Sequence, residues 1–436
     1  MGGMKDLANL VGELREELEV CMRCGMCQAV CPVFGETGRE SDVARGKLAL
    51  LDGIIEGMFK NPRGVQDRLR RCLLCGSCEA HCPSGVKTFD VFLKARAILT
   101  GVMGYSPLKR TLFRGLLAYP GLFHRVFEWA ASLQDFFLKP ADDLLETFQG
   151  RALSPLVGER HVRKLASPPF HRTRKALRKP AGKSNLRVAF FVGCVIDKVF
   201  PQVADAILHA LDWHEVEVHL PRDLGCCGIP ALCAGDTVSF AKLVRHNLRS
   251  LTSEPLDYLV TGCATCTSTI KKLWPTLVRD FNDQEALQVR PLAERTMDIS
   301  QFLVEKSVLP YSPNHTSYST IPIAYHDPCH LKKLLGVGAQ PRSLIRAGGL
   351  YRLVEMEDPD GCCGCGGSFS LEHHDISVSI GRRKRENIVR SGCRVVATGC
   401  PACMLHISDM LSRAGDRIPV KHTLEIYAEA LGWKRV

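Results

Sequence analysis

The chain has 436 residues, of which 45% are hydrophobic and 24% charged, values that exclude a disordered or fibrous chain. It carries a formal net charge of +11 and contains 21 cysteines. No run of 18 apolar residues occurs, and the charged start MGGMKDLANLVGELREELEV lacks the apolar core of a secretion signal. We therefore expect a cytoplasmic location, where cysteines serve as metal ligands more often than as disulfides.

Two cysteine motifs near the N-terminus share one spacing. The first contains Cys21, Cys24, Cys27 and Cys31, and the second contains Cys72, Cys75, Cys78 and Cys82, each 51 positions after its counterpart. Both read C-x2-C-x2-C-x3-C-P, the spacing of two-cluster ferredoxins, in which the fourth cysteine binds the partner cluster. We predict one [4Fe-4S] cube on Cys21, Cys24, Cys27 and Cys82, and another on Cys72, Cys75, Cys78 and Cys31. A zinc site or redox-active thiols are the alternatives.

The stretch between the motifs has apolar residues at helical spacing: Leu48, Leu51, Ile54, Ile55 and Met58. Asp42 is the expected N-cap of this helix. The pattern predicts a helix-rich ferredoxin domain over residues 1–100.

A helical connector is predicted over residues 101–158. Its apolar and aromatic part, residues 112–138, is interrupted by Arg114, Pro120, Arg125 and Glu128. Three interpretations remain open: packing between neighbouring domains, an interfacial helix pair at a membrane, or a docking surface for a partner.

A basic linker is predicted over residues 159–186. Ten lysines and arginines and no acidic residue lie between Arg160 and Arg187, so the rest of the chain is nearly neutral. Its proline and small residues indicate a solvated tether, with contact to anionic lipid or to an acidic partner subunit as the alternative.

A longer cysteine repeat follows. The first copy contains Cys194, Cys226, Cys227, Cys263 and Cys266, and the second contains Cys329, Cys362, Cys363, Cys400 and Cys403. Offsets of 135 to 137 residues between equivalent cysteines indicate one module used twice, which predicts domains over residues 187–305 and 306–436.

Apolar, β-rich runs end just before Cys194, Cys263, Cys329 and Cys400, and helical patterns separate them. This alternation is typical of parallel βαβ units. Because ligands gather beyond the carboxyl ends of such strands, we expect the five thiols of each copy to converge at one sheet edge. Buried structural cysteine is the alternative.

The five-cysteine modules resemble CCG (cysteine-rich) domains of heterodisulfide reductase subunits and of the iron–sulfur subunits of glycolate oxidase, lactate utilisation and anaerobic glycerol-3-phosphate dehydrogenase systems. The phrases CMRCGMCQAVCPVFG, ARGKLALL, CLLCGSCEAHCPSGV, HDPCHL and CCGCGGSFS carry the resemblance, which covers nearly the whole chain. The order of a twin-cluster ferredoxin and two CCG domains is similar to that of glycolate oxidase iron–sulfur subunits. The fold class implied is α+β multidomain, with a helix-rich ferredoxin domain before two tandem α/β CCG domains.

The resemblance implies two [4Fe-4S] cubanes in the ferredoxin domain and one or two further [4Fe-4S] clusters, cubane or noncubane, on the CCG cysteines. It implies an electron-transfer subunit of an oxidoreductase complex, in which a partner flavin subunit oxidises glycolate or D-lactate and electrons leave to a quinone or another carrier. A membrane or quinone-reactive partner, at the inner face of the membrane, is compatible with this role. The alternative is a heterodisulfide-reductase-like subunit in which CCG cysteines are catalytic, an alternative favoured by the complete C-x-x-C pairs, Cys263 with Cys266 and Cys400 with Cys403.

Other motifs point to no further cofactor. The sequence lacks a dinucleotide fingerprint, a Walker A lysine and a flavin motif, so we expect no flavin or NAD on this chain. The basic run at residues 382–385 lacks interleaved aromatics, so a solvated helix face is expected rather than nucleic-acid binding. Cys233 and Cys393 are expected in the core, and Cys365 is left without a role.

Overall fold

The computed structural model describes residues 4–151, 158–173, 184–280, 283–309 and 320–435. The chain divides into two compact units. Unit 1 comprises Met1–Ala118, Gly228–Phe240 and Gly361–Arg383, and unit 2 comprises Tyr119–Cys227, Ala241–Asp360 and Lys384–Val436. Each unit is described separately below.

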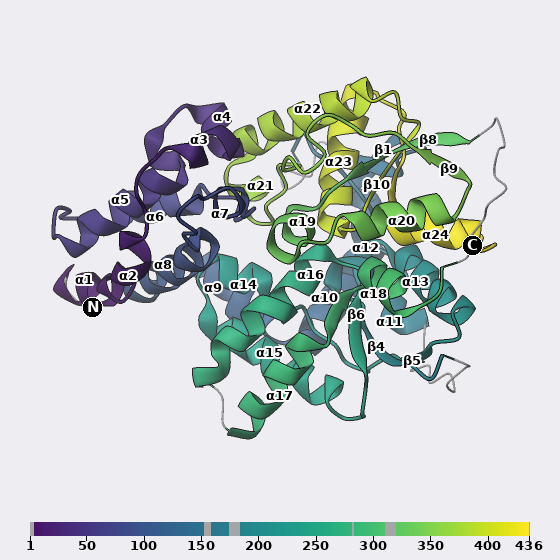
Figure 1. The fold of residues 1–436 in the computed structure, drawn as a ribbon, viewed down its shortest axis with the longest axis horizontal. Coiled ribbons are helices and arrows are strands. Elements are labelled where there is room, and N and C mark those ends of the chain that lie inside the picture. Colours follow the sequence, from purple (N-terminus) through teal and green to yellow (C-terminus); the bar gives the residue numbers. More distant parts are fainter. Residues whose placement is uncertain (1–3, 152–157, 174–183, 281–282, 310–319, 436) are drawn as a thin grey trace. The chain divides into compact units, whose positions relative to one another are not determined.

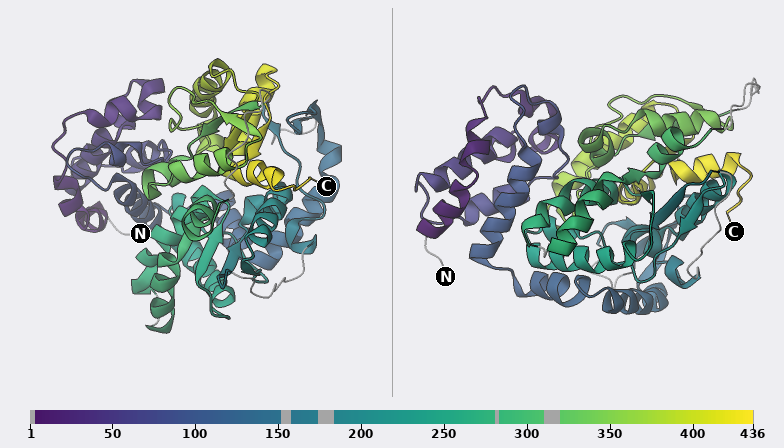
Figure 2. Two further views of the ribbon diagram at one scale, coloured as in Figure 1. Left: turned by 45° about the vertical axis from the view of Figure 1, so that its right-hand side comes forward. Right: turned by 60° about the horizontal axis from the view of Figure 1, so that its bottom comes forward.

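The regular elements of unit 1 in its described part are all helices, and the purple ribbons of Figure 2 show the first of them. Its N-terminal helices are α1 (Met4–Gly12), α2 (Arg15–Glu19), α3 (Met26–Val30), α4 (Pro32–Thr37), η1 (Glu40–Asp42), α5 (Ala44–Ile55), α6 (Arg63–Arg70), α7 (Ser77–Ala80), α8 (Thr88–Met103), α9 (Pro107–Arg110) and the π-helix η2 (Thr111–Leu117). The later segments of the chain add α14 (Ile229–Cys233), α21 (Phe369–Glu372) and the first turns of α15 (Thr237–Leu251) and α22 (His374–Arg390).

The core of unit 1 lies between α1, α5 and α8. Leu48, Leu51 and Ile54 of α5 are buried as the helical pattern predicted, whereas Met58 lies beyond the helix and is exposed. The predicted cap is wrong: α5 begins after Val43, and no side chain caps it. Asp42 is instead buried one residue earlier, where its carboxylate accepts a hydrogen bond from Arg68.

Unit 2 contains two parallel sheets of four strands. The first consists of β4 (Arg187–Phe191), β5 (Glu217–His219), β6 (Tyr258–Thr261) and β7 (Thr296–Asp298), in the order β5-β4-β6-β7. The second consists of β8 (Ile321–His326), β9 (Tyr351–Leu353), β10 (Val395–Thr398) and β11 (Val420–His422), in the order β9-β8-β10-β11. When the strands of each sheet are numbered in chain order, both sheets have the order 2-1-3-4. The two copies of the cysteine repeat therefore share one sheet topology.

The helices of these two sheets connect successive parallel strands, as the prediction of βαβ units required. The first sheet is accompanied by α12 (Cys194–Val199), α13 (Pro201–Trp213), most of α15, α16 (Ala264–Ser268), the π-helix η3 (Thr269–Leu273), η4 (Trp274–Asp280), α17 (Asp283–Glu294) and α18 (Ile299–Lys306). The second is accompanied by α19 (Cys329–Leu335), α20 (Ala339–Ala347), the end of α22, α23 (Pro401–Ala414) and α24 (Thr423–Ala430).

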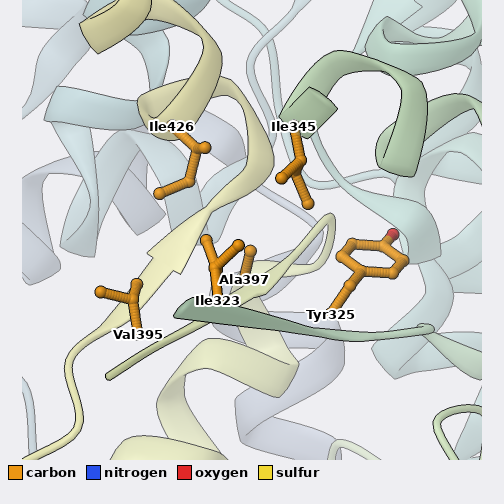
Figure 3. Close-up of a cluster of buried hydrophobic side chains, with 6 residues drawn as sticks. All are labelled: Ile323, Tyr325, Ile345, Val395, Ala397 and Ile426. Carbon is orange, nitrogen blue, oxygen red and sulfur yellow. The ribbon is translucent and has the colours of Figure 1, made fainter. Parts of the chain in front are cut away.

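The second sheet packs its apolar face against α20 and α24. Figure 3 shows this cluster, in which Ile323 and Tyr325 of β8 meet Ile345 of α20 and Ile426 of α24. These four side chains are at most 1% exposed. Burying apolar surface stabilises a fold by roughly 25 cal/mol per Å². This packing therefore holds the strands, and the cysteines that follow them, in place.

The connector contains more than the predicted helices. After α10 (Pro120–Phe137), the chain forms an antiparallel sheet of β1 (Leu138–Asp142), β2 (Thr147–Gly150) and β3 (His161–Val162), which the sequence pattern did not indicate.

The basic segment is not a solvated tether over its described part. It contributes β3 and α11 (Phe170–Thr173), buries Phe170, and pairs Arg163 with Glu146 and Arg172 with Glu128. Five of its ten basic residues lie outside the described residues: Arg174, Lys175, Arg178, Lys179 and Lys183. The run at residues 382–385 also departs from a solvated face, because Lys384 is buried and donates to the carbonyl of Asp358.

Among the described residues, no helix is both long and apolar enough to cross a bilayer.

Candidate iron–sulfur and thiol sites

A small cavity in unit 1 is lined by Cys31, Cys72, Cys75 and Cys78. These are the four cysteines that the motif spacing assigned to one cube, three from the second motif and the last cysteine of the first. Short turns present them, because Leu74 adopts a φ of 53° and Gly76 a φ of 73°, which reverse the chain around the cavity.

A second cavity is lined by Cys21, Cys24, Cys27 and Cys82. Cys78, which also lines the first cavity, reaches this one too. Arg23 and Gly25, with φ values of 57° and 88°, occupy the positions equivalent to Leu74 and Gly76. The structure thus groups the eight cysteines as the cross-paired spacing predicts; that they bind two cubes stays a prediction.

Backbone N–H groups point at the sulfur atoms of both motifs. The amide of Phe34 donates to Cys31 Sγ at 3.5 Å, that of Leu74 to Cys72 Sγ at 3.4 Å and that of Val86 to Cys82 Sγ at 3.4 Å. Such donors stabilise negative charge on sulfur and raise the potential of a bound cluster. The donor set therefore fits iron–sulfur ligation.

Lys47 supplies a buried positive charge beside the first cavity, which it lines. Its side chain is 1% exposed and donates to the carbonyl of Asp42. Burial lowers its pKa, while the nearby Cys72 and Cys31 act to raise it. An ammonium group at this position fits a cavity that holds an anionic centre. The sequence pattern did not indicate a role for this lysine, because only its burial beside the cavity sets it apart from other lysines.

The first five-cysteine set forms one thiol cluster in unit 2. Cys194 begins α12 directly after β4, and Cys263 follows β6, so the two stand at the point where the strand order reverses, where open sheets bind ligands. Cys194 Sγ lies 3.7 Å from Cys226 Sγ, and hydrogen bonds join Cys226 to Cys227, and Cys227 to Cys266.

Four of these five cysteines are buried, and Cys194 is half-buried. Hydrogen bonds from neighbouring cysteines and burial raise the pKa of Cys226 and Cys266. A thiolate here therefore needs a compensating cation, and an iron–sulfur centre supplies one. The amide of Asn247 donates to the carbonyl of Cys226, and the indole N–H of Trp274 donates to the carbonyl of Cys227, so both cysteines are fixed through their backbone.

The C-x-x-C pairs of the two copies meet inside unit 2. Cys263 and Cys400 share a side-chain hydrogen bond, which lowers the pKa of Cys400. Thr265 Oγ1 lies 3.6 Å from Cys400 Sγ, and the amide of Ala264 donates to the carbonyl of Gly399 at 3.1 Å. His422, at the end of β11, donates through Nε2 to the carbonyl of Gly262 at 2.9 Å. The sequence did not predict this meeting of the two copies.

The second five-cysteine set is divided between the units. Cys329, Cys400 and Cys403 belong to unit 2, and Cys362 and Cys363 belong to unit 1. Cys329 and Cys400 follow β8 and β10 as predicted. Within unit 1, the amide of Gly364 donates to Cys362 Sγ at 3.4 Å, the same contact that the ferredoxin cysteines receive. Ligation by this set stays a prediction.

Two of the cysteines outside the motifs, Cys393 and Cys233, occupy structural positions. Cys393 is buried in unit 2, as expected, and its thiol donates to the carbonyl of Ile388. The half-buried Cys233 offers its carbonyl to Arg96, whose guanidinium also binds the carbonyls of Leu69 and Cys72 and so braces the second motif.

Comparison with known proteins bears on what these sites hold. Residues 17–86 match the 4Fe-4S dicluster domain, and residues 188–271 and 323–408 each match the cysteine-rich CCG domain. The chain is an iron–sulfur protein with two CCG domains. This result, with the helical unit and the parallel sheets, establishes the predicted α+β multidomain class, whereas the exact domain limits stay predictions.

Three named proteins illustrate what this CCG-domain protein is similar to. It is 26% identical over 99% of its length to the probable glycolate oxidase iron-sulfur subunit of Bacillus subtilis (strain 168), covering 98% of that protein. Lactate utilization protein A of an Exiguobacterium strain is 29% identical over 56% of this chain and 98% of its own length. A dihydromethanophenazine:CoB–CoM heterodisulfide reductase subunit of Methanosarcina barkeri (strain Fusaro) is 24% identical over 98% of this chain and 97% of its own length. The chain is therefore an iron–sulfur electron-transfer protein related to subunits of oxidoreductase complexes, which implies partner subunits.

Proposed function

We propose that this chain is the electron-transfer subunit of a flavin-dependent 2-hydroxy-acid dehydrogenase that oxidises glycolate or D-lactate. A partner subunit would hold the flavin, and the acceptor would be a quinone or another carrier. The observation that carries the proposal is the presence, on one chain, of two four-cysteine cavities in unit 1 and a five-thiol cluster in unit 2. Full-length similarity to a glycolate oxidase iron–sulfur subunit supports it.

The proposed cofactors are two [4Fe-4S] cubanes on the ferredoxin cysteines and one or two further clusters, cubane or noncubane, on the CCG cysteines. When bound, such clusters accept and release single electrons. The residues of the chain set how readily they do so. The backbone N–H groups that donate to the sulfur atoms of Cys31, Cys72 and Cys82, and the ammonium group of Lys47, favour the reduced, more negative state.

A peripheral membrane position is part of the proposal, and α10 supports it. One face of this helix carries Leu122, Val126, Trp129 and Phe136, spaced three, four or seven residues apart and 37% to 74% exposed. Its acids are neutralised, since Glu128 binds Arg172 and Asp135 binds Lys164 at 2.6 Å. The exposed Arg125 and Lys139 leave this face with positive charge. An apolar, aromatic stripe with basic flanks suits an anionic bilayer surface.

Purification of the native complex through a tag on this chain tests the proposed function. We expect a flavin-containing subunit to co-purify, and anaerobic glycolate or D-lactate to bleach the visible absorption of the clusters. A complex whose clusters respond to no 2-hydroxy acid would contradict the proposal.

A heterodisulfide-reductase-like function is the second candidate, in which CCG cysteines handle a disulfide substrate. The contact between Cys263 and Cys400 favours it, because both copies keep complete C-x-x-C pairs and bring them together. Electron paramagnetic resonance of the oxidised protein with an added thiol distinguishes the two. A thiol-induced signal that is lost in Cys400→Ser and kept in Cys393→Ser would establish this function and exclude a purely electron-carrying role.

A further inference from the structure

Unit 2 contains a cavity of about 540 Å³ whose lining combines three kinds of residue. Cys194 and Cys226 of the first thiol cluster lie on one wall, but Cys227, Cys263 and Cys266 do not line it, so the cavity lies beside the cluster. Apolar side chains supply much of the rest: Phe123, Phe170, Val192, Leu220, Pro221 and Leu224. The volume is that of a site for a small organic molecule.

Three further lining residues, His124, His171 and Asp197, are joined by hydrogen bonds. His171 Nε2 lies 3.0 Å from Glu128 Oε1, and its Nδ1 lies 2.9 Å from Asp197 Oδ1. Lys198 Nζ donates to Asp197 Oδ2 at 2.6 Å and lies 2.6 Å from His124 Nδ1. The chain of contacts thus leads from Glu128, which is 25% exposed, through His171, Asp197 and Lys198 to His124. It connects solvent with the cavity wall.

This group is not arranged as a metal site. His124, His171 and Asp197 lie close enough together to bind a cation. The ammonium group of Lys198, however, already lies among them at hydrogen-bond distances and is 4% exposed. The geometry instead suits proton movement, because every neighbour in the chain is a donor or an acceptor.

The charges in and beside the cavity are equal in number, since Lys198 and Arg222 stand against Asp197 and Asp223. A carboxylate or another anionic substrate needs a surplus of cations, which these residues do not provide. A neutral, largely apolar ligand fits better. Helix α10, which contributes Phe123 and His124 to the cavity, also carries the exposed apolar stripe through which a lipid-soluble ligand would approach.

We propose that this cavity is the site where a quinone is reduced. The inference rests on the proposed electron-transfer function and names its acceptor and the acceptor's place. Reduction of a quinone to a quinol consumes two electrons and two protons, and each carbonyl oxygen gains one hydrogen. Cys194 and Cys226 would hold an iron–sulfur centre that supplies the two electrons one at a time, and the two proposed ferredoxin-domain clusters would supply an electron to that centre between the two transfers. The protons pass from His171 and its partners and are replaced from solvent through Glu128.

Calorimetric titration of the oxidised, full-length holoprotein with ubiquinone-1 or menadione tests binding without any electron donor or flavin subunit. We expect saturable binding with one site per chain, weakened about tenfold in Phe123→Ala, since one apolar wall is lost. His209→Gln, on α13 and outside the cavity lining, should bind as the wild type does. Absence of saturable binding, equal affinity in Phe123→Ala, or binding of a small disulfide in place of the quinones would overturn the proposal.

A second measurement addresses His171. Protein reduced with dithionite and freed of excess reductant is mixed with ubiquinone-1, and quinol formation is followed. For His171→Gln we expect a lower maximal rate of quinol formation. The quinone concentration that gives half of the maximal rate should change little. A changed affinity with an unchanged maximal rate would contradict a proton-transfer role. Neither measurement uses a 2-hydroxy acid, so each tests the quinone site separately from the proposed dehydrogenase function. A negative result for quinone would leave that function standing, and loss of that function would leave a measured quinone site standing.

Discussion

Single buried charges and sulfur contacts set the chemistry of this protein at the residue scale. In unit 1, Lys47 brings a positive charge to a cavity lined by four cysteines, and backbone amides donate to three cysteine sulfurs. Both features lower the energy of a centre that gains negative charge on reduction. Cysteine spacing predicts the ligands, but the charged and hydrogen-bonding groups around them become visible only once burial is known.

Lys47→Met tests the role of this charge. Removing a cation next to the first cavity makes electron uptake less favourable, so the midpoint potential of one cluster should fall by roughly 50 mV, given a Coulomb term of about 1 kcal/mol. A redox titration followed by electron paramagnetic resonance measures it. Lys47→Arg keeps the charge and should keep the potential, as should Lys87→Met at an exposed position. Equal potentials in wild type and Lys47→Met would contradict the assignment.

Cys82→Ser tests the cross-pairing of the motifs. Because Cys82 lines the cavity of Cys21, Cys24 and Cys27, the variant should lose or alter that cube and retain the other. Spectra of Cys82→Ser and Cys24→Ser should show the same remaining cluster, and Cys393→Ser should retain both. Selective loss of the cube on Cys72, Cys75 and Cys78 would show that the pairing is wrong.

Packing between elements accounts for how the cysteines are held in place. In unit 1, α5 passes so close to η1 that Gly46 has no room for a side chain. In unit 2, α13 and α24 join the two CCG domains through His214 and Tyr427, whose Nε2 and hydroxyl lie 2.8 Å apart. The first contact is local in sequence, whereas the second joins residues 213 positions apart.

Gly46→Ala should destabilise unit 1. An added Cβ would lie 1.9 Å from the carbonyl oxygen of Glu40, and overpacking against backbone costs about 1–3 kcal/mol. Gly64→Ala in α6 is the matched control: its Cβ meets nothing within 4 Å, so helix propensity makes it neutral or mildly stabilising. The unfolding temperature should therefore fall for Gly46→Ala, whereas for Gly64→Ala it should stay the same or rise. Similar destabilisation by both would refute the close approach.

His214 should make stability depend on pH. Burial lowers its pKa to about 4, compared with roughly 6.5 in the unfolded chain. The unfolded state then binds more protons between these values, so stability falls as pH drops from about 7 towards 4, by roughly 2 kcal/mol at pH 5 for this group. In His214→Gln, the decrease in unfolding temperature between pH 7 and pH 5 should be smaller. An identical decrease in both proteins would contradict the buried, neutral histidine.

Sequence patterns predicted the regular elements well where periodicity was strong. The strands before Cys194, Cys263, Cys329 and Cys400 are present, as is the α5 helix. The cap at Asp42 was wrong because an ion pair with Arg68 holds this carboxylate away from the helix end. Strands β1 to β3 were missed because they are short: β1 and β2 lie in the segment predicted as a helical connector, and β3 lies in the predicted basic linker. The cavity beside Cys194 collects His124, His171 and Asp197 from three separate helices, a grouping that no local pattern encodes.

The whole molecule combines a dicluster unit and a pair of CCG domains on one chain, with an exposed apolar stripe on α10. This combination is compatible with the proposed electron transfer from a partner subunit to an acceptor at a membrane. The charge of +11 does not describe a uniformly basic protein, because ten basic residues lie between Arg160 and Arg187.

The stripe predicts reversible membrane binding. The wild type should co-sediment with vesicles that contain anionic phosphatidylglycerol, and a Trp129→Ser, Phe136→Ser double variant should bind several-fold less because buried apolar area is lost. Leu287→Ser, at a site 74% exposed on α17, is the control and should bind like the wild type. Equal binding by the double variant would argue against α10 as the contact surface.

The central claim, that this chain is an iron–sulfur electron carrier, is tested most directly by metal and sulfide analysis of the anaerobically purified protein, together with electron paramagnetic resonance after reduction. The account predicts at least about eight iron and eight acid-labile sulfide atoms per chain, and a reduced spectrum of two interacting [4Fe-4S] clusters. Zinc without sulfide, and no signal on reduction, would contradict it.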